Sequence, residues 1–132
     1  MPNDSEFESI KKYISEFDLD NRDLKIEQFV IAKSGNELVG FGRIRKHNGC
    51  DEMCSLGIIV PERNKGVAKL LIQHRIRLST QPLYLVCIIP DMFIPLGFKI
   101  VTEFPPEIQN KLDYCRGELV VEEEYVVMQY IK

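Results

Sequence analysis

Hydrophobic and polar residues alternate along the first half of the chain as they do in half-buried strands. Leu38–Arg45 alternates at every second position, and it follows a strand-like segment, Glu27–Lys33. The segment between them, Ser34–Glu37, has the residues of a tight hairpin turn. A second polar turn, His47–Cys50, leads into the strand Glu52–Ile58. The pattern therefore predicts an antiparallel meander of three strands.

Apolar residues recur at helical spacing in two stretches. The first follows Asp4 or Ser5, either of which can cap a helix that extends to about Phe17. The second is Val67–Leu78. Phe7, Ile10, Ile14 and Phe17 form one face of the first helix. In the second, Val67, Leu70, Leu71 and Leu78 recur at helical spacing, with Ala68, Ile72 and Ile76 on an adjoining row.

The remaining strands are separated by helical segments. The apolar run Leu56–Val60 should end at Pro61, which has no N–H to donate to a strand ladder. A helix separates it from the apolar strand Leu83–Ile89, and such a helix normally makes the two strands parallel neighbours. Gly97 should end a short turn in the left-handed conformation. The expected fold class is α/β with a mixed sheet. Its last elements are the strand Phe98–Phe104, the helix Pro105–Cys115 and the strand Glu122–Ile131.

A basic segment with small residues precedes the helix that starts at Val67. Its sequence is Arg63-Asn-Lys-Gly-Val-Ala68, and no acidic residue occurs between Glu62 and Asp91. The first N–H groups of a helix have no partner within the helix, and the helix dipole places partial positive charge there. Because Gly66 lets a ligand approach the backbone, the segment is suited to binding a phosphate. The plainer interpretation is a connecting turn with solvated basic residues.

This segment resembles the Arg/Gln-x-x-Gly-x-Gly/Ala pyrophosphate loop of the GCN5-related N-acetyltransferases (GNATs). Three more segments are similar to the family pattern: Glu52–Ile58 to its fourth strand, Leu83–Ile89 to its fifth, and Phe93–Phe98 to the aromatic-x-x-Leu-Gly-Phe motif that follows. The resemblance implies one GNAT-like domain over residues 1–132, with the meander followed by a parallel strand–loop–helix–strand crossover. The Pro-Pro-Glu segment near the C-terminus also loosely resembles acetyltransferases that act on free amino acids.

The resemblance implies that acetyl-CoA (coenzyme A) is the cofactor. It assigns the pyrophosphate to backbone N–H groups of the loop, with charge added by Arg63 and Lys65. It assigns the pantetheine arm to the backbone of the preceding strand, and the thioester oxygen to the N–H of Ile58. The implied cofactor-binding residues are Leu56, Gly57, Ile58, Arg63, Asn64, Lys65, Gly66, Val67 and Ala68.

Glu52 is the candidate general base, because the glutamate of the family pattern falls at this position. Period-two alternation places it on the same face of the strand as Leu56 and Ile58. Partial burial would raise its pKa and suit it to take a proton from an ammonium, directly or through water. The alternative is that Glu52 begins the strand and faces solvent beside Asp51.

Two other positions bear on the reaction. Arg43 and Arg45 share one face of their strand, where guanidinium groups could bind a carboxylate of the acceptor, and a solvated face is the other interpretation. Many family members resembling this chain have a tyrosine general acid at the position of Phe93, which has no proton to give. A thiolate can leave without an acid, or water, Tyr84 or Tyr125 could serve.

The sequence thus indicates an acetyl-CoA-dependent N-acetyltransferase. The acetyl group would pass directly to a primary amine of a small molecule, such as an amino acid, or of a protein, because no residue is placed as a nucleophile beside a base. The rival hypothesis is a catalytically silent acyl-CoA-binding sensor or assembly module. Phe93 favours the rival, and Glu52 argues against it.

Composition excludes several other classes of function. The net charge of −3 argues against a nucleic-acid partner, which usually leaves a basic footprint. The four cysteines form no C-x-x-C pair and the two histidines have no ligand-like spacing, so no metal site is expected. No signal peptide or membrane-spanning run is found, so we expect a cytoplasmic protein without a membrane partner. A homodimer is an expectation from the family resemblance alone.

Overall fold

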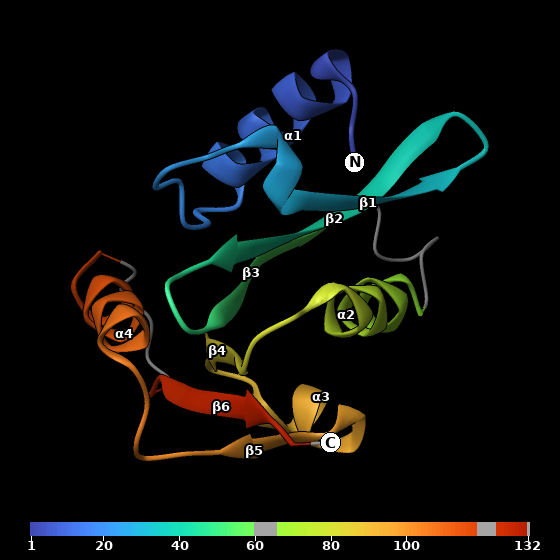
Figure 1. Cartoon of the computed structure of the whole chain (residues 1–132). Coiled ribbons are helices and arrows are strands. Elements are labelled where there is room, and N and C mark those ends of the chain that lie inside the picture. Colours follow the sequence, from blue (N-terminus) through green and yellow to red (C-terminus); the bar gives the residue numbers. More distant parts are fainter. Residues whose placement is uncertain (60–65, 119–123, 132) are drawn as a thin grey trace. The chain divides into compact units, whose positions relative to one another are not determined.

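The computed structural model describes residues 1–59, 66–118 and 124–131 (Figure 1). The chain divides into two compact units. The N-terminal unit comprises Met1–Arg45 and Met53–Leu78, and the C-terminal unit comprises Lys46–Glu52 and Ser79–Lys132. The elements are α1 (Asp4–Glu16), η1 (Ile26–Gln28), β1 (Phe29–Ser34), β2 (Glu37–Lys46), β3 (Asp51–Ile58), α2 (Val67–Leu78), β4 (Leu83–Cys87), α3 (Pro90–Phe93), η3 (Ile94–Leu96), β5 (Phe98–Ile100), α4 (Pro106–Glu118) and β6 (Val126–Tyr130).

The strands form a six-stranded mixed sheet in the order β1-β2-β3-β4-β6-β5. Strands β1 and β2 are the predicted antiparallel hairpin, with Phe29 opposite Arg43 and Gly35 at the turn with φ +62°. Strand β3 begins in parallel with β4, with Asp51 opposite Leu83. The predicted meander and parallel crossover are therefore both confirmed. The mixed α/β fold class is confirmed with them.

Helix α1 is capped by Asn3, so the prediction of Asp4 or Ser5 as the cap is wrong. Asn3 Oδ1 accepts the N–H of Glu6 at 2.8 Å, and Glu6 Oε1 accepts the N–H of Asn3 at 2.9 Å. This reciprocal capping box satisfies two N–H groups that would otherwise have no helical partner. Asn3 is favoured because Glu6 lies three residues after it, where the second half of the box must be.

The N-terminal unit has its core between α1 and the hairpin. The core cluster is Ile10, Ile14, Phe29 and Phe41. The ring of Phe29 packs edge-on against that of Phe41 at 6.3 Å between centroids. Ile10 and Ile14 confirm the predicted apolar face of α1, whereas Phe17, the last predicted member, is exposed.

The buried face of α2 differs from the predicted one. Leu70 and Leu78 are 64% and 47% exposed, whereas Leu71, Ile72 and Arg75 are buried. Strand β2 explains this choice, because it presents two glycines to the helix. A Cβ at Gly40 would lie 3.1 Å from Leu71, and one at Gly42 would lie 2.7 Å from the Arg75 guanidinium. The missing side chains leave room for Arg75 to lie flat on the strand.

Strand β3 is irregular at Ser55, which has φ +51°. A left-handed residue interrupts the pleat, so side chains do not continue to alternate through it. The expectation that Glu52 shares a continuous face with Leu56 and Ile58 is therefore wrong. The strand ends at Ile58, so the predicted extension to Val60 lies partly outside the described residues.

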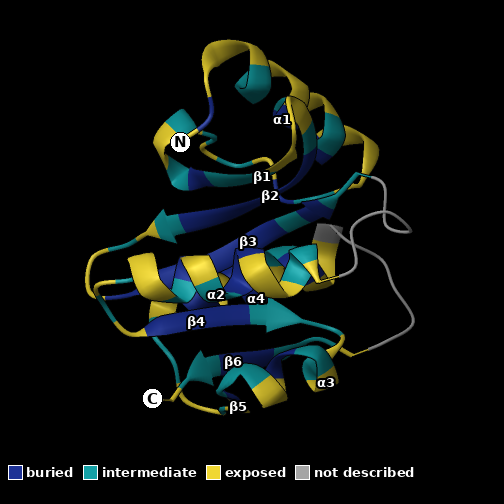
Figure 2. Cartoon of the chain, turned by 90° about the vertical axis from the view of Figure 1, so that its right-hand side faces the viewer, coloured by how far each residue is buried: buried dark blue, intermediate teal, exposed yellow. Residues whose placement is uncertain are grey.

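The C-terminal unit is built around β4 and β6, which pair antiparallel with Leu85 opposite Met128. The first three residues of β4 are buried, as Figure 2 shows. Gly97 has φ +104° before β5, which confirms the predicted left-handed turn. Strand β5 is shorter than predicted, and β6 starts at Val126, whereas residues 122 and 123 of the predicted last strand lie outside the described residues.

Helix α4 packs on β4 and β6 and closes the core of the C-terminal unit. That core cluster consists of Cys50, Tyr84, Ile108, Leu112 and Val127. Within the described ranges, no helix has both the length and the apolar character needed to cross a membrane.

Candidate functional site

The first N–H groups of helix α2 have no acceptor within the helix. The first helical hydrogen bond runs from the N–H of Leu70 to the carbonyl of Gly66 at 3.0 Å, so the N–H groups before it have no helical acceptor. Gly66 has φ +85°, and a Cβ built on it would meet no atom within 4 Å. The first turn contains no acidic residue. Arg63, Asn64 and Lys65, the other predicted members of this loop, lie outside the described residues.

The end of β3 is the predicted site of the pantetheine arm, and its geometry depends on Gly57. A Cβ on Gly57 would lie 2.3 Å from the ring of Phe41, so any side chain here would displace that ring from the core. Just after the strand, the N–H of Ile59 donates to the carbonyl of Val39 at 3.0 Å. The packing of β3 against Phe41 of β2 therefore requires a glycine at this position.

Arg75 belongs to the interior and not to a basic surface. Its guanidinium donates to the carbonyls of Arg43 at 3.1 Å and Cys54 at 2.9 Å, and its Nε donates to the carbonyl of Leu71 at 3.3 Å. Burial lowers the pKa of Arg75 to about 10, although the Cys54 thiol partly opposes this. The charge bias that suggested a phosphate ligand therefore cannot include Arg75.

Arg43 is also buried, with 0% of its surface exposed, so the interpretation as a solvated face is wrong for it. Its Nε donates to Gln28 Oε1 at 2.8 Å, and its terminal nitrogens donate to the carbonyls of Asp20 and Arg22. These contacts hold the guanidinium inside the N-terminal unit, which contradicts the expected role in binding an acceptor carboxylate.

Arg45, on the same strand, is occupied by acids of its own unit. Its guanidinium lies 3.2 Å from an oxygen of Asp23 and 3.8 Å from one of Asp20. Asp20 is itself buried and accepts two hydrogen bonds from the Arg22 guanidinium. The group is thus a structural network that joins the Asp18–Lys25 loop to β2.

Glu52 is completely buried, so the interpretation as a solvent-facing residue is wrong. One carboxylate oxygen lies 2.9 Å from His47 Nε2, and the other lies 3.5 Å from Lys111 Nζ. His47 comes from the turn before β3 and Lys111 from α4, and all three residues belong to the C-terminal unit. We call these three residues the Glu52 cluster.

Sequence reasoning missed both partners of Glu52. Lys111 is 5% exposed, and its ammonium lies 5.9 Å from the ring centre of Tyr114 on the same helix. A lysine inside an otherwise apolar helical face was the available signal, because such a residue is rarely buried without an acidic partner. His47 was discounted because its sequence spacing suited no metal site.

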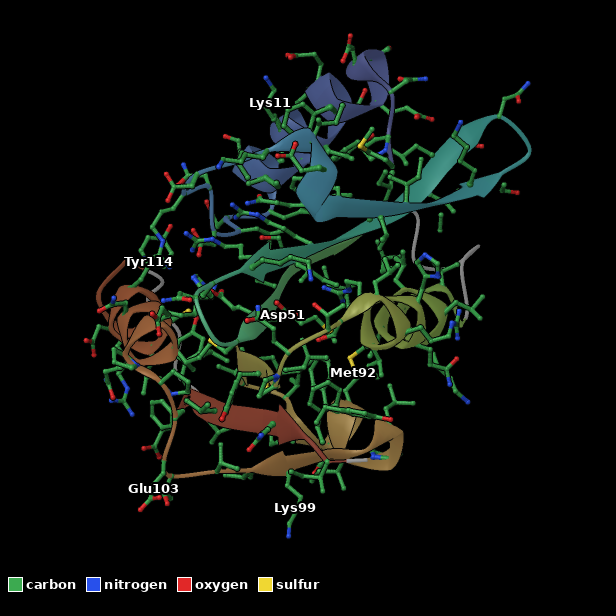
Figure 3. All side chains as sticks on the ribbon, in the orientation of Figure 1. Lys11, Asp51, Met92, Lys99, Glu103 and Tyr114 are labelled. Atoms are coloured by element: carbon green, nitrogen blue, oxygen red, sulfur yellow. The ribbon has the colours of Figure 1, made fainter. Side chains whose placement is uncertain are left out.

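Asp51, next to Glu52, has a different environment. Burial alone would raise the pKa of Asp51, but hydrogen bonds outweigh this effect and the pKa lies below its usual value. The donors are Ser79 Oγ at 2.8 Å, Gln81 Nε2 at 2.9 Å and the N–H of Thr80 at 3.1 Å. Lys46 Nζ lies 3.4 Å away. Asp51 therefore ties the start of β3 to the segment before β4 (labelled in Figure 3).

The described cysteines and carboxylates do not gather into a metal site: no group of three or more potential ligands is found in the described part of the chain. Burial raises the pKa of Cys50 to about 11, and the nearby carboxylates of Glu107, Asp51 and Glu52 act in the same direction. Cys50 is therefore a neutral thiol at physiological pH and not an activated nucleophile.

A family model for the acetyltransferase (GNAT) family matches residues 2–91. This match covers more than half of the sequence. The chain belongs to the GNAT family. No curated protein sequence matches it.

Solved structures resemble this GNAT in fold. Rv2747 from Mycobacterium tuberculosis, in complex with CoA and NLQ, has a TM-score of 0.74 at 12% identity over 97% of this chain and 95% of that one. Arabidopsis thaliana Naa50, in complex with the bisubstrate analogue CoA-Ac-MVNAL, has a TM-score of 0.67 at 14% identity over 99% and 95%.

A third similar structure is N-acetylglutamate synthase from Neisseria gonorrhoeae, complexed with coenzyme A and N-acetyl-glutamate. Its TM-score is 0.70 at 16% identity, over 100% of this chain but 34% of that one. This GNAT therefore spans about a third of the synthase it resembles. At these identities the likeness concerns the fold.

The position where the GNAT resemblance expects a tyrosine is occupied by a packed phenylalanine. Phe93 is buried and its ring is edge-on to that of Phe98 at 5.8 Å between centroids. Tyr84, one of the substitutes considered, is part of the core of the C-terminal unit. Tyr130 packs edge-on against Phe98, as expected of a core or rim aromatic residue.

Proposed function

We propose that this GNAT is an acetyl-CoA-dependent N-acetyltransferase, a single domain over residues 1–132 that transfers an acetyl group directly to a primary amine. The observation that supports this most is the start of α2, where N–H groups without a helical acceptor follow Gly66, whose φ is positive. Backbone donors at a helix N-terminus are suited to a pyrophosphate, and the family match gives that ligand its identity.

The cofactor would be held mainly by backbone groups. Gly66, Val67 and Ala68 would donate to the pyrophosphate, with Arg63, Asn64 and Lys65 completing the loop. Gly66 fits this role because nothing occupies the space where its side chain would be. When bound, acetyl-CoA supplies an acetyl thioester. Leu56, Gly57 and Ile58 would position it, with the N–H of Ile58 stabilising charge on the thioester oxygen.

Glu52 is the proposed catalytic carboxylate. An ammonium must lose a proton before its nitrogen can attack, and a carboxylate within the fold can provide the charge for that transfer. Because Glu52 is completely buried, it would act through an intervening group and not by touching the amine. The acceptor is a primary amine of a small molecule or a protein. N-acetylglutamate synthase and Naa50 make amino acids and peptide N-termini sensible first choices to screen.

Calorimetric titration with acetyl-CoA tests the cofactor site. We expect native protein to bind and Ala68→Glu to lose at least about tenfold in affinity, because a carboxylate in the first turn of α2 repels the pyrophosphate. A glutamate at a helix N-terminus favours the helix, so lost affinity cannot be attributed to a damaged fold. The control is Ser9→Glu, which makes the same charge change on the exposed face of α1.

Two results would contradict the proposal. Equal affinity of native protein and Ala68→Glu would exclude the start of α2 as the pyrophosphate site. Binding of acetyl-CoA without thiol release in the presence of amino acids, polyamines or peptides would favour the rival function, a silent acyl-CoA-binding module. The rival function is tested because Phe93 stands where many family members have a tyrosine general acid.

A further inference from the structure

The Glu52 cluster contains two acid–base side chains in direct contact, and only one of them is exposed. Glu52 has 0% of its side chain exposed, whereas His47 has 16%. Their contact, 2.9 Å between Glu52 Oε1 and His47 Nε2, is within hydrogen-bond range. Of the two side chains, only that of His47 is in contact with solvent.

The contact determines which imidazole nitrogen is basic. An ionised carboxylate only accepts hydrogen bonds, so beside ionised Glu52 the hydrogen is on His47 Nε2, and in the neutral imidazole the lone pair is then on Nδ1. Among the described residues, Nδ1 has no hydrogen-bond partner. The backbone of His47 is fixed independently, because its N–H donates to Cys50 at 2.9 Å and its carbonyl accepts from Gln81 Nε2 at 3.0 Å.

Lys111 stabilises the ionised form of Glu52. Its ammonium lies 3.5 Å from Glu52 Oε2 and is buried with it. Burial of a carboxylate favours the neutral acid, and a lysine ammonium at this distance favours the charged form. The ring of Tyr114, labelled on α4 in Figure 3, lies 5.9 Å from the same ammonium, measured to the ring centre. The cation thus keeps Glu52 an acceptor for the imidazole.

We propose that His47 takes the proton from the acceptor ammonium, with Glu52 as the positioning residue that orients the imidazole and offsets its charge. This inference rests on the proposed acetyltransferase function and deepens it. A carboxylate that holds an imidazole in one tautomer and stabilises the imidazolium is a recurring arrangement in catalysis.

In the proposed transfer, each proton and the acetyl group have a defined destination. The Nδ1 lone pair takes one proton from the ammonium, and the freed amine nitrogen forms a bond to the acetyl carbonyl carbon. The carbon–sulfur bond breaks, and sulfur keeps its electron pair. Nitrogen loses a second proton as the amide forms, so one proton goes to the coenzyme thiolate and one to solvent. No oxidant or reductant is needed.

Other titratable groups lie near Glu52 or its neighbours and contribute to any pH dependence. Lys111 is 3.5 Å from Glu52, and Tyr84 is paired with Glu52 across the strands. The neighbours Cys50 and Asp51 add Glu107 and Lys46, because Glu107 acts on the Cys50 thiol and Lys46 lies 3.4 Å from Asp51.

The test compares native protein with His47→Ala, using acetyl-CoA calorimetry and thiol release with an acceptor amine found by screening. We expect His47→Ala to keep acetyl-CoA affinity, to lose roughly 10²–10⁴-fold in turnover, and to lose the acidic limb of the pH–rate profile. Added imidazole should restore part of the turnover, which a merely structural role of His47 would not allow. The control is His74→Ala, because His74 is the only other histidine and is exposed on α2.

A spectroscopic readout is independent of turnover. With two histidines, ¹⁵N-resolved imidazole spectra are assigned by the His74→Ala control, and His47 should be the Nε2–H tautomer in native protein and should change in Glu52→Gln. The Nδ1–H tautomer in native protein, turnover of His47→Ala within about threefold of native, or loss of turnover without imidazole rescue would each overturn the inference. Absence of acetyl-CoA binding by native protein would instead overturn the proposed function, and this inference with it.

Discussion

Each unit of this GNAT buries a charged cluster, and the two clusters are built from different partners. In the N-terminal unit, Arg43 and Arg75 donate mainly to backbone carbonyls, which belong to the loop before η1, to strands β2 and β3 and to α2. In the C-terminal unit, Glu52 contacts His47 and Lys111, two side chains that can themselves gain or lose a proton. The arginine network therefore holds backbone groups in place, whereas the Glu52 cluster joins side chains that are acids and bases.

The difference shows which property of a buried charge points to chemistry. Burial and a shifted pKa are present at Arg75, yet its partners are carbonyls, which cannot exchange protons. The Glu52 cluster adds acid–base partners and one member with access to solvent. Acid–base contact together with exposure is thus a better guide to function than burial alone.

The largest effect should come from removing the arginine network. Arg75→Met leaves the carbonyls of Arg43 and Cys54 without this donor and opens space over Gly42, so we expect the free energy of unfolding to fall by about 4 kcal/mol. Urea unfolding measures this. Arg77→Met, an exposed change on the same helix, should stay within about 0.5 kcal/mol. A loss below about 1 kcal/mol for Arg75→Met would mean that relief of the buried charge compensates fully, and the network would not be structural.

Glu52 and Lys111 should show a coupling energy in stability that exposed ion pairs lack. Glu52→Gln and Lys111→Met each remove one member of a buried ion pair, so each should lower the free energy of unfolding by roughly 3 kcal/mol. The double variant should lose less than the sum of the two, by about 1–2 kcal/mol in a double-mutant cycle followed by urea unfolding.

A matched pair on the surface provides the control for this cycle. Glu8 and Lys11 are 2.7 Å apart on α1 but exposed, so their coupling should not exceed about 0.5 kcal/mol. Equal coupling in the two pairs would remove the distinction between a buried charge cluster and an ordinary salt bridge.

Local sequence patterns were sufficient for the elements of the fold. Alternation gave the hairpin and the meander, and glycine chemistry gave the left-handed turn at Gly97. These local patterns failed where the packing is determined by residues that are distant in the sequence. The buried face of α2 includes Arg75 because two glycines on β2 make room for it, and no periodicity within the helix contains that information.

The candidate site was predictable in its residue types but not in its contacts. Glu52 could be selected by its register to the Arg63–Ala68 loop, because both lie in one contiguous stretch of sequence. Its burial could not be predicted, because Lys111 reaches it from a helix near the other end of the chain. The break at Ser55 could not be predicted either, because its positive φ is imposed by the surrounding strand and is not a preference of serine.

The smallest effect should come from Asp51, which lies next to Glu52 but is held mainly by hydrogen bonds from Ser79, Gln81 and the N–H of Thr80. Its folded pKa is lowered, so its stabilisation is complete above the unfolded aspartate pKa and is lost as pH falls through the folded value. We expect Asp51→Asn to lower the free energy of unfolding by about 2 kcal/mol at neutral pH, because the donors of Ser79 and Thr80 lose a charged acceptor. The difference from native protein should shrink below about pH 4.

Urea unfolding at neutral pH and at about pH 3 measures this change, with the exposed Asp113→Asn as the control that should alter stability little at either pH. A native-to-variant difference that stays constant as pH falls would show that Asp51 contributes by shape and not by charge. The pH–rate profile of acetyl transfer provides the second measurement. Asp51→Asn should keep the acidic limb that His47→Ala loses, because the hydrogen-bonded carboxylate of Asp51 has no proton-exchanging partner of the kind that Glu52 has in His47.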